Sequence, residues 1–261
     1  MEIIRSKDNP KVKRLALLHD RKKARGEGLV FIEGTRLCED ALISGAMPSV
    51  IAYTEKRSSY AQSLIEKYGL TCEQIVMTDE CFSKISSTSN PQGIAMAVPE
   101  PSLYKEIPFR NDGKDIYVVL ENLQDPGNLG TIIRLADAFD LTAVIMTRGS
   151  ADPYNEKVLR SSMGSVWHIP VVTVDSLPDL FSFFRDKGIT TLSCDLNGKL
   201  LPESRIDLPA AYFIGNEGAG LTEETVSSCD IRVKIPMPGK AESLNAASAA
   251  SIIGYVLASL R

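Results

Sequence analysis

The chain has 261 residues, 44% of them hydrophobic, which is enough for one large domain or two ordinary ones. Its formal net charge of -4 argues against a protein that coats nucleic acid through its overall field, so any RNA contact has to come from a local patch. The five cysteines form no CxxC pair or metal-ligand spacing, and their odd number argues against a disulfide framework. We therefore expect reduced thiols and no metal site.

The sequence carries no recognisable targeting or membrane segment. Its start lacks the apolar core of a signal peptide, and no stretch approaches the roughly 20 apolar residues of a membrane span. We expect a soluble, cytoplasmic protein without membrane contact.

The first 28 residues are strongly basic. They hold nine lysines and arginines against four acids, an excess that would bind several phosphates. A solvated basic helix face accounts for the same charge equally well, so charge alone leaves both interpretations open. The candidate RNA-binding residues are Arg5, Asn9, Lys11, Lys13, Arg14, Lys22, Lys23, Arg25 and, beyond this segment, Arg36.

The first hundred residues alternate helical and strand-like patterns, which predicts a small α/β domain over residues 1–98. The expected elements are a helix after Pro10, an apolar run at 29–32, a helix at 35–44, a strand at 50–53, a helix at 58–68 and an apolar segment at 93–98. Three prolines without hydrophobic periodicity then predict a linker over residues 99–114.

Residues 115–261 predict a second α/β domain. Its expected strands lie at 116–120, 142–146, 166–172, 189–194, 211–214 and 231–235, with helices between them and a last helix at 243–260. This alternation predicts an open parallel sheet with helices on both faces, and a ligand site where loops leave the carboxyl ends of the strands.

The first polar loop of this domain follows the strand at 116–120. A turn at residues 125–127 leads into a helix beginning near Asn128, and Arg134 lies six residues further on. Taken alone, this pattern favours the ordinary interpretation, in which the asparagine caps the helix and the arginine is a surface charge.

The second loop follows the strand at 211–214. Three glycines within six residues surround Asn216 and Glu217, so backbone amides can approach a ligand without an intervening Cβ. The spacing fits neither G-x-G-x-x-G nor the P-loop, which disfavours a dinucleotide or ATP site. A tight structural turn remains open as an interpretation.

The third loop precedes the final helix. Pro236, Pro238 and Gly239 form a rigid irregular segment that leads to Ser243, Leu244 and Asn245 at the start of an Ala/Ser-rich helix. A packed core helix with Ser243 as its N-cap is the alternative interpretation.

Together the three loops resemble the SpoU/TrmH family of the SPOUT superfamily, the RNA 2′-O-ribose methyltransferases. Three patterns carry the resemblance: DP-x-N-x-G-x-x-x-R at residues 125–134, G-x-E-G-x-G-L at 215–221, and I-P-M followed by S-L-N at 235–245. The segment SSMGSVWHIPV at 161–171 is also similar to the family. Nearer the N-terminus, IRSKDNPKVKRLALL and FIEGTRLCEDAL resemble the substrate-binding domain of these enzymes, which is similar to ribosomal protein L30e.

The resemblance implies a parallel sheet whose C-terminal part forms a deep trefoil knot, a rare exception to the rule against threading. It also implies that the knot holds S-adenosylmethionine largely through backbone groups. The implied cofactor-binding residues are Gly215, Ile235 and Leu244, with Thr147 and Gly149 as further contributors.

The resemblance assigns Arg134 to the activation of a ribose 2′-hydroxyl, with Asn128, Glu217, Ser243 and Asn245 orienting it and the substrate. A guanidinium has a pKa above about 12, so stabilisation of the emerging alkoxide suits Arg134 better than the role of a literal base. The implied partners are RNA, with ribosomal RNA favoured over transfer RNA, and a second copy in a homodimer that shares the active site.

Two other functions compete with this one. An RNA chaperone that kept the fold and lost catalysis would be favoured by loss of Asn128, Arg134 or Glu217, and all three are present. A nucleotide-binding oxidoreductase or hydrolase would require a glycine fingerprint after the first strand and an acid about 20 residues on, and the sequence has neither.

Overall fold

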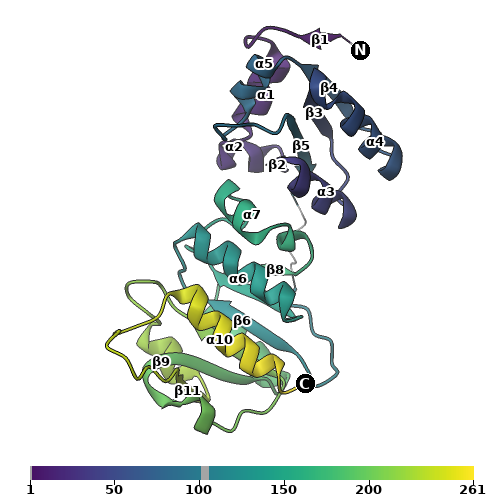
Figure 1. Cartoon of the computed structure of the whole chain (residues 1–261). Coiled ribbons are helices and arrows are strands. Elements are labelled where there is room, and N and C mark those ends of the chain that lie inside the picture. The colour runs from purple at the N-terminus through teal and green to yellow at the C-terminus, as the bar shows by residue number, and fades with distance from the viewer. Residues whose placement is uncertain (1, 101–105) are drawn as a thin grey trace. The chain divides into compact units, whose positions relative to one another are not determined.

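A computed structural model describes residues 2–100 and 106–261 (Figure 1). The chain divides into two compact units, Met1–Pro101 and Ser102–Arg261. Each has its own sheet and its own helices, and each is described by itself below.

The N-terminal unit is built on a mixed five-stranded sheet in the order β1-β4-β3-β5-β2. Neighbouring strands are parallel from β1 to β3, and β5 is antiparallel to both β3 and β2. The strands are β1 (Ile3–Ile4), β2 (Leu29–Glu33), β3 (Val50–Thr54), β4 (Glu73–Met77) and β5 (Ile94–Pro99). The helices are α1 (Pro10–Leu17), α2 (Arg21–Gly26), α3 (Thr35–Ile43), the short 3-10 helix η1 (Glu55–Arg57), α4 (Ser58–Tyr68) and α5 (Asp79–Ile85).

One face of this sheet packs against α1, α2 and α5. Val12 and Leu15 from α1 and Phe82 and Ile85 from α5 are buried in one cluster with alternate residues of the strands.

The predicted elements of this region are confirmed, but the basic helix is divided in two at Asp20, which caps α2 with its side chain. Strands β1 and β4 and helix α5 were missing from the prediction.

The C-terminal unit is built on a wholly parallel six-stranded sheet in the order β11-β9-β10-β6-β7-β8. The strands are β6 (Ile116–Leu120), β7 (Ala143–Thr147), β8 (Val171–Val174), β9 (Thr190–Leu200), β10 (Ala210–Ile214) and β11 (Ile231–Lys234). The helices are α6 (Pro126–Ala138), α7 (Glu156–Ser162), η2 (Ser165–Trp167), α8 (Leu177–Asp186), η3 (Leu201–Glu203), α9 (Glu223–Ser228) and α10 (Ala246–Ala258).

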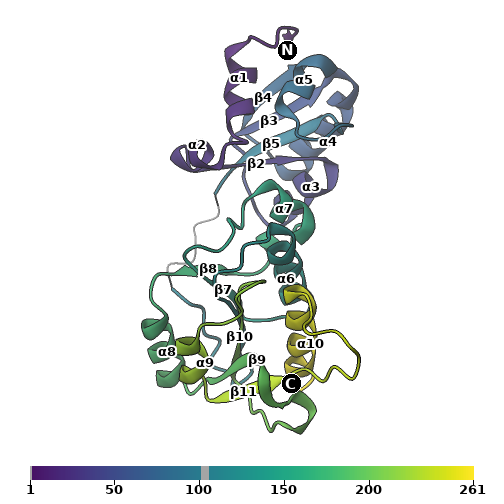
Figure 2. The same ribbon diagram turned by 90° about the vertical axis from the view of Figure 1, so that its left-hand side faces the viewer.

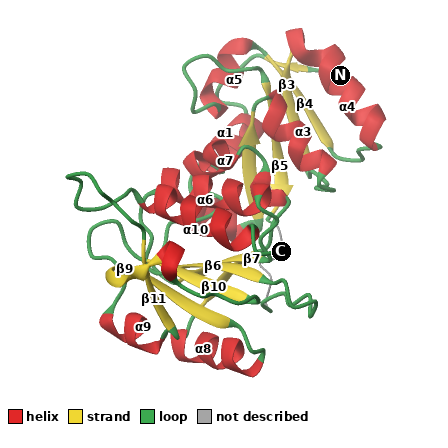
Figure 3. Ribbon diagram, turned by 60° about the horizontal axis from the view of Figure 1, so that its bottom comes forward, coloured by secondary structure: helices red, strands yellow, loops and turns green. Residues whose placement is uncertain are grey.

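Helices cover both faces of this parallel sheet, as predicted. Helices α8 and α9 lie on one face and α6 and α10 on the other (Figures 2 and 3). Strands β6 and β10 are buried along their whole length, which explains why they read as continuous apolar runs rather than alternating patterns. Helix α10 packs along α6 although more than a hundred residues separate them in the sequence (Figure 1).

Three predicted elements of this unit were wrong in their bounds. The strand expected at 189–194 continues to Leu200 as β9. The strand expected from residue 166 begins at Val171, because Met163 and Gly164 adopt left-handed conformations and turn the chain into η2. The last helix begins at Ala246 rather than Ser243. Its N-cap is Asn245, whose side chain accepts hydrogen bonds from the amides of Ala247 and Ser248.

Residues 106–114 of the predicted linker belong to the C-terminal unit in the structure. Ile107 and Phe109 pack against the buried cluster under α8, and the Tyr117 hydroxyl donates to the carbonyl of Pro108 at 2.7 Å. Residues 101–105 of that linker lie outside the described residues.

The order of the strands creates a switch point between β6 and β10. From β6 the chain continues on one side through β7 and β8, whereas β10, β9 and β11 lie on its other side. Leu120 pairs with Ile214 at the carboxyl ends of these two strands, and the amide of Glu121 donates to the Ile214 carbonyl at 2.9 Å. The loops after β6 and β10 therefore leave the sheet side by side, which is where open α/β sheets bind ligands.

Close packing of α6 on α7 predicts the effect of one substitution. A Cβ added at Gly130 would lie 1.9 Å from Ser161 Oγ and 2.6 Å from the carbonyl oxygen of Val158. We expect Gly130→Ala to lower the free energy of unfolding by about 1–3 kcal/mol, seen as a lower melting temperature. Gly239→Ala is the control, because nothing lies within 4 Å of its added Cβ. Equal melting temperatures for the two variants would contradict this contact.

Candidate active site

Three side chains from three distant loops form one hydrogen-bonded cluster. Asn128 Nδ2 donates to Glu217 Oε1 at 3.0 Å, and Asn128 Oδ1 accepts from Asn245 Nδ2 at 2.9 Å. The residues come from the first turn of α6, the glycine-rich loop after β10 and the N-cap of α10. The three loops singled out in the sequence therefore meet in space. We call Asn128, Glu217 and Asn245 the amide cluster.

The Glu217 carboxylate is held by nitrogen donors. The amide of Gln124 donates to Oε2 at 3.1 Å, and the amide of Asp125 donates to Oε1 at 2.9 Å, beside the bond from Asn128. Partial burial acts to raise the pKa of Glu217, but the bonds from Asn128, Asp125 and Gln124 together outweigh it and leave the pKa below its ordinary value. Glu217 is therefore an ionised anchor that ties its loop to the start of α6.

Asp125, rather than Asn128, caps α6. Asp125 Oδ1 accepts from the Asn128 amide at 2.8 Å, with Pro126 in the first turn. This corrects the interpretation of Asn128 as the cap and leaves its side chain free for the cluster. The hydrogen bond from the Asn128 amide lowers the pKa of Asp125, and Lys157, whose Nζ lies 3.1 Å from Asp125 Oδ2, lowers it further.

The glycines after β10 permit a backbone contact that no side chain could replace. A Cβ on Gly215 would lie 2.1 Å from the carbonyl carbon of Gly220. Asn216 and Gly220 exchange two backbone hydrogen bonds, at 3.0 and 2.9 Å, and the Asn216 side chain accepts from the amides of Gly218 and Ala219. The loop is thus a tight turn, and residues 217–220 are exposed.

The loop after β7, with Thr147 and Gly149, is tied to the loop after β6 through Asn122. The Asn122 amide donates to Thr147 Oγ1 at 2.9 Å, and a Cβ on Gly149 would lie 2.5 Å from Asn122 Oδ1. The Asn122 carbonyl accepts from Asn216 Nδ2 at 2.9 Å. The predicted contributors at residues 147–149 therefore lie in the same group of loops as Gly215.

Arg134 lies apart from the amide cluster. Six residues of α-helix separate it from Asn128, about 9 Å along the axis and about 240° around it. Its side chain is exposed, and within residues 2–100 and 106–261 it makes no hydrogen bond or ion pair. Ser243 and Leu244 are also exposed, and Ile235 is half-buried. Within the described residues, none of these four predicted residues makes a side-chain hydrogen bond to the amide cluster, although Leu244 directly precedes Asn245 in the chain.

Most predicted RNA-binding residues of the N-terminal unit pair with acids of the same unit. The pairs are Lys11 with Glu73, Lys13 with Asp8, Arg14 with Glu27, Lys23 with Asp20 and Arg36 with Asp40. Asn9 caps α1 by accepting from the Lys11 amide. Arg5, Lys22 and Arg25 are exposed. Exposed pairs of this kind are weak and solvent-screened, so a phosphate can compete for them.

The sequence reasoning missed several residues that hold the site together. Glu121, buried at the end of β6, accepts from both the amide and the hydroxyl of Thr222 and so anchors the far end of the glycine-rich loop. Asn122, Gln124 and Lys157 were also missed. An acidic residue directly after a buried apolar strand was the available signal for Glu121.

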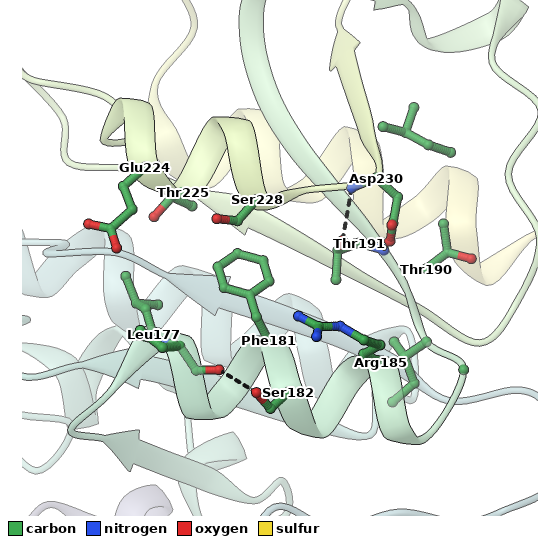
Figure 4. Close-up of a pocket in the computed structure, with 14 residues that line it drawn as sticks. Leu177, Phe181, Ser182, Arg185, Thr190, Thr191, Glu224, Thr225, Ser228 and Asp230 are labelled. Atoms are coloured by element: carbon green, nitrogen blue, oxygen red, sulfur yellow. Dashed lines mark hydrogen bonds between the residues drawn. The ribbon is translucent and has the colours of Figure 1, made fainter.

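A groove of about 750 Å³ lies elsewhere in the C-terminal unit, between α8, α9 and the first residues of β9 and β11. Figure 4 shows Phe181 projecting from α8 into this groove beside Arg185, with Asp230 bound to Thr191 at its far end. It opens at the amino ends of the strands, and none of the predicted site residues lines it. This groove is therefore distinct from the amide cluster.

The part of the chain that the structure describes contains no group of three or more His, Cys, Asp or Glu residues placed to hold a metal ion. Within the same residues, no helix is both long and apolar enough to cross a membrane.

An open parallel sheet with its polar loops gathered at one switch point defines an α/β ligand-binding domain. Residues 115–255 match the model of the SpoU rRNA Methylase family, and the chain belongs to that family. Residues 9–96 match the MRM3-like substrate binding domain.

Relatives are similar over nearly the whole chain. A 23S rRNA (guanosine(2553)-2′-O)-methyltransferase of Bacillus subtilis is 36% identical over 98% of this chain and 99% of its own length. A 23S rRNA (uridine(2479)-2′-O)-methyltransferase of Streptomyces viridochromogenes is 31% identical over 92% of this chain and 86% of its own. The SpoU methyltransferase AviRb from S. viridochromogenes, solved with S-adenosylmethionine, has a TM-score of 0.86, 30% identity, and coverage of 97% of this chain and 98% of its own.

The carboxylate of Glu217 gives the site a pH dependence that can be measured. Its folded pKa is lowered, so its contribution to stability is fully present above the ordinary value of 4.5 and is lost as the pH falls through the lowered folded value. At neutral pH we expect Glu217→Gln to lower the free energy of unfolding by no more than about 1 kcal/mol, seen as a lower melting temperature. The difference from the unsubstituted protein should shrink below pH 4.5.

Glu203→Gln is the matched control, because Glu203 is exposed and, within the described chain, bonds to no other side chain. If the melting temperature of Glu217→Gln stays below that of the unsubstituted protein by the same amount from neutral to acidic pH, the role given to the carboxylate is contradicted.

Proposed function

We propose that this protein transfers the methyl group of S-adenosylmethionine to a ribose 2′-hydroxyl of ribosomal RNA. The amide cluster is the observation that carries the proposal, because it unites the three loops whose patterns resemble the family. The named functions of the full-length relatives, both 23S rRNA 2′-O-methyltransferases, support it.

The loops suit the cofactor through their chemistry. The exposed turn at residues 217–220 offers backbone carbonyl groups for a ribose and an adenine edge, and Leu244, 38% exposed, offers an apolar contact for the ring. We propose that Gly215, Ile235 and Leu244 hold S-adenosylmethionine, with Thr147 and Gly149 at the rim. The bound cofactor supplies an electrophilic methyl group.

The residues of this chain would then position the hydroxyl for an in-line displacement. The side chain of Asn128 is fixed on both sides, by Glu217 and by Asn245, so it presents one orientation to the substrate. We propose that Ser243, which is exposed two residues before Asn245, contacts the ribose. We propose that Arg134 stabilises the oxygen as it loses its proton.

Because Arg134 is remote from Asn128 on α6, we propose a homodimer in which each copy supplies Arg134 to the other copy's amide cluster. Exposed apolar side chains on α10 support such an interface. Ile252 and Tyr255 are 39% and 64% exposed on the helix that packs along α6.

We propose that the segment after β11 completes a deep trefoil knot. Strand β11 lies at one edge of the sheet, beyond β9, yet the next helix, α10, packs on β10, β6 and α6. Residues 235–245 connect this edge strand to Asn245 beside Asn128, the connection that would complete such a knot.

We further propose that residues 1–98 form an L30e-like RNA-binding domain and residues 115–261 the methyltransferase domain of a cytoplasmic enzyme. The match of residues 9–96 to a substrate-binding domain supports the first assignment.

Radiolabelled methyl transfer tests the activity. Purified protein should label RNA from a strain that lacks it, and mapping should place the methyl group on a ribose 2′-oxygen of ribosomal RNA. Arg134→Ala should lose at least about a hundredfold in turnover while its melting temperature and cofactor affinity stay unchanged. Cofactor-independent RNA binding without methylation would instead indicate the chaperone function.

Mixed dimers test the shared site. We expect Arg134→Ala and Asn245→Ala to be inactive alone, and a dimer containing one copy of each, purified through two different tags, to recover about half of the activity, because one of its two sites keeps both groups. An inactive mixed dimer would show that Arg134 acts within its own chain.

A further inference from the structure

Lys157 extends from α7 over the first turn of α6. Asn155 caps α7 by accepting from the Lys157 amide at 2.9 Å, and the Lys157 ammonium reaches Asp125 Oδ2 at 3.1 Å. The side chain passes Gly127, where an added Cβ would lie 3.4 Å from Lys157 Cε. The same Cβ would lie 2.8 Å from Asp125 Oδ1, so the glycine leaves room chiefly for the carboxylate that Lys157 binds.

This ammonium is the cation that touches the residues around the amide cluster. Within residues 2–100 and 106–261, Glu217 is bonded only by amide nitrogens, and Asp125 has Lys157 as its ion-pair partner. The side chain of Lys157 is 58% exposed. An ammonium has three N–H donors, so Lys157 can donate to Asp125 and to a second anion at the same time.

An RNA substrate brings such an anion to this place. The 2′-hydroxyl and the 3′-phosphodiester sit on neighbouring carbons of one ribose, so a site that holds the hydroxyl also meets the phosphate. Two ionised carboxylates, Asp125 and Glu217, would repel that phosphate unless a cation stood between them. Phosphate contacts of this kind fix the register of a nucleic acid on a protein.

We propose that Lys157 binds the 3′-phosphodiester of the target nucleotide and so positions the ribose on the amide cluster. The inference rests on the proposed function. Arg160, on the same helix, offers the comparison. Its guanidinium pairs with Glu156 at 2.5 Å within α7, whereas Lys157 pairs with Asp125 beside the amide cluster.

Paired neutral substitutions on α7 test this assignment. Lys157→Gln and Arg160→Gln each remove one positive charge from the same helix. We expect Lys157→Gln to raise the KM for RNA about tenfold and to reduce the slope of log affinity against log salt by about one. Cofactor affinity should not change, Arg160→Gln should stay within about twofold of the unsubstituted protein, and Lys157→Arg should retain most of the affinity.

Asp125→Asn separates phosphate binding from a purely structural ion pair. It removes the charge of Asp125 and keeps both the capping oxygen and Lys157. If Lys157 acts only by holding Asp125, then Asp125→Asn and Lys157→Gln will lose activity equally and neither will change the salt slope, which would overturn the inference. Failure of the unsubstituted protein to methylate any RNA would instead refute the proposed function. If the unsubstituted protein is active but Lys157→Gln leaves the slope of log RNA affinity against log salt unchanged, only the phosphate contact is refuted.

Discussion

The structure of the site depends on the carboxamide of Asn128, which donates one hydrogen bond and accepts another. Glu217 is ionised and can only accept, which turns Asn128 Nδ2 towards it and leaves Asn128 Oδ1 to face Asn245. Asn245 can donate there because its own oxygen already caps α10. An aspartate at 128 would place two carboxylates in contact, and an aliphatic residue would satisfy neither partner. The direction of every bond in the cluster therefore follows from the charge of Glu217.

That chain of bonds links the amino ends of two helices. One end is the first turn of α10, and the other is the turn before α6, where the amides of Gln124 and Asp125 also bind Glu217. Helix amino ends favour negative charge, so the carboxylate sits where both backbone donors and helix dipoles stabilise it. The parallel register of Leu120 with Ile214 is what brings these loops within reach of each other.

The sequence predicted those features that depend on local pattern. Buried parallel strands such as β6 and β10 are continuous apolar runs, and the proline and glycine spacing marked all three loops. The caps were harder, because Asp125 and Asn128, or Ser243 and Asn245, are equally suitable residue types and only the backbone geometry selects between them. Strand β4, EQIVM, begins with two polar residues, so its apolar run is only three residues long and its pattern is weak. Contacts such as Asn122 with Asn216 join residues far apart in the chain, and no local spacing indicates them.

The saturation of the amide cluster limits what it can do chemically. Both oxygens of Glu217 and both polar atoms of Asn128 are already bonded, and the lowered pKa of Glu217 makes it a poor proton acceptor near neutral pH. The cluster can therefore orient a substrate but has no spare charge for an oxygen that is losing its proton. Such charge has to come from side chains outside it that remain available. Lys157 is partly committed to Asp125, whereas Arg134 is exposed and, within the described residues, uncommitted. In the proposed mechanism, the amide cluster positions the substrate and Arg134 supplies the charge, so the two have to be brought together when the site is assembled. In the proposed dimer, that step coincides with the pairing of two chains.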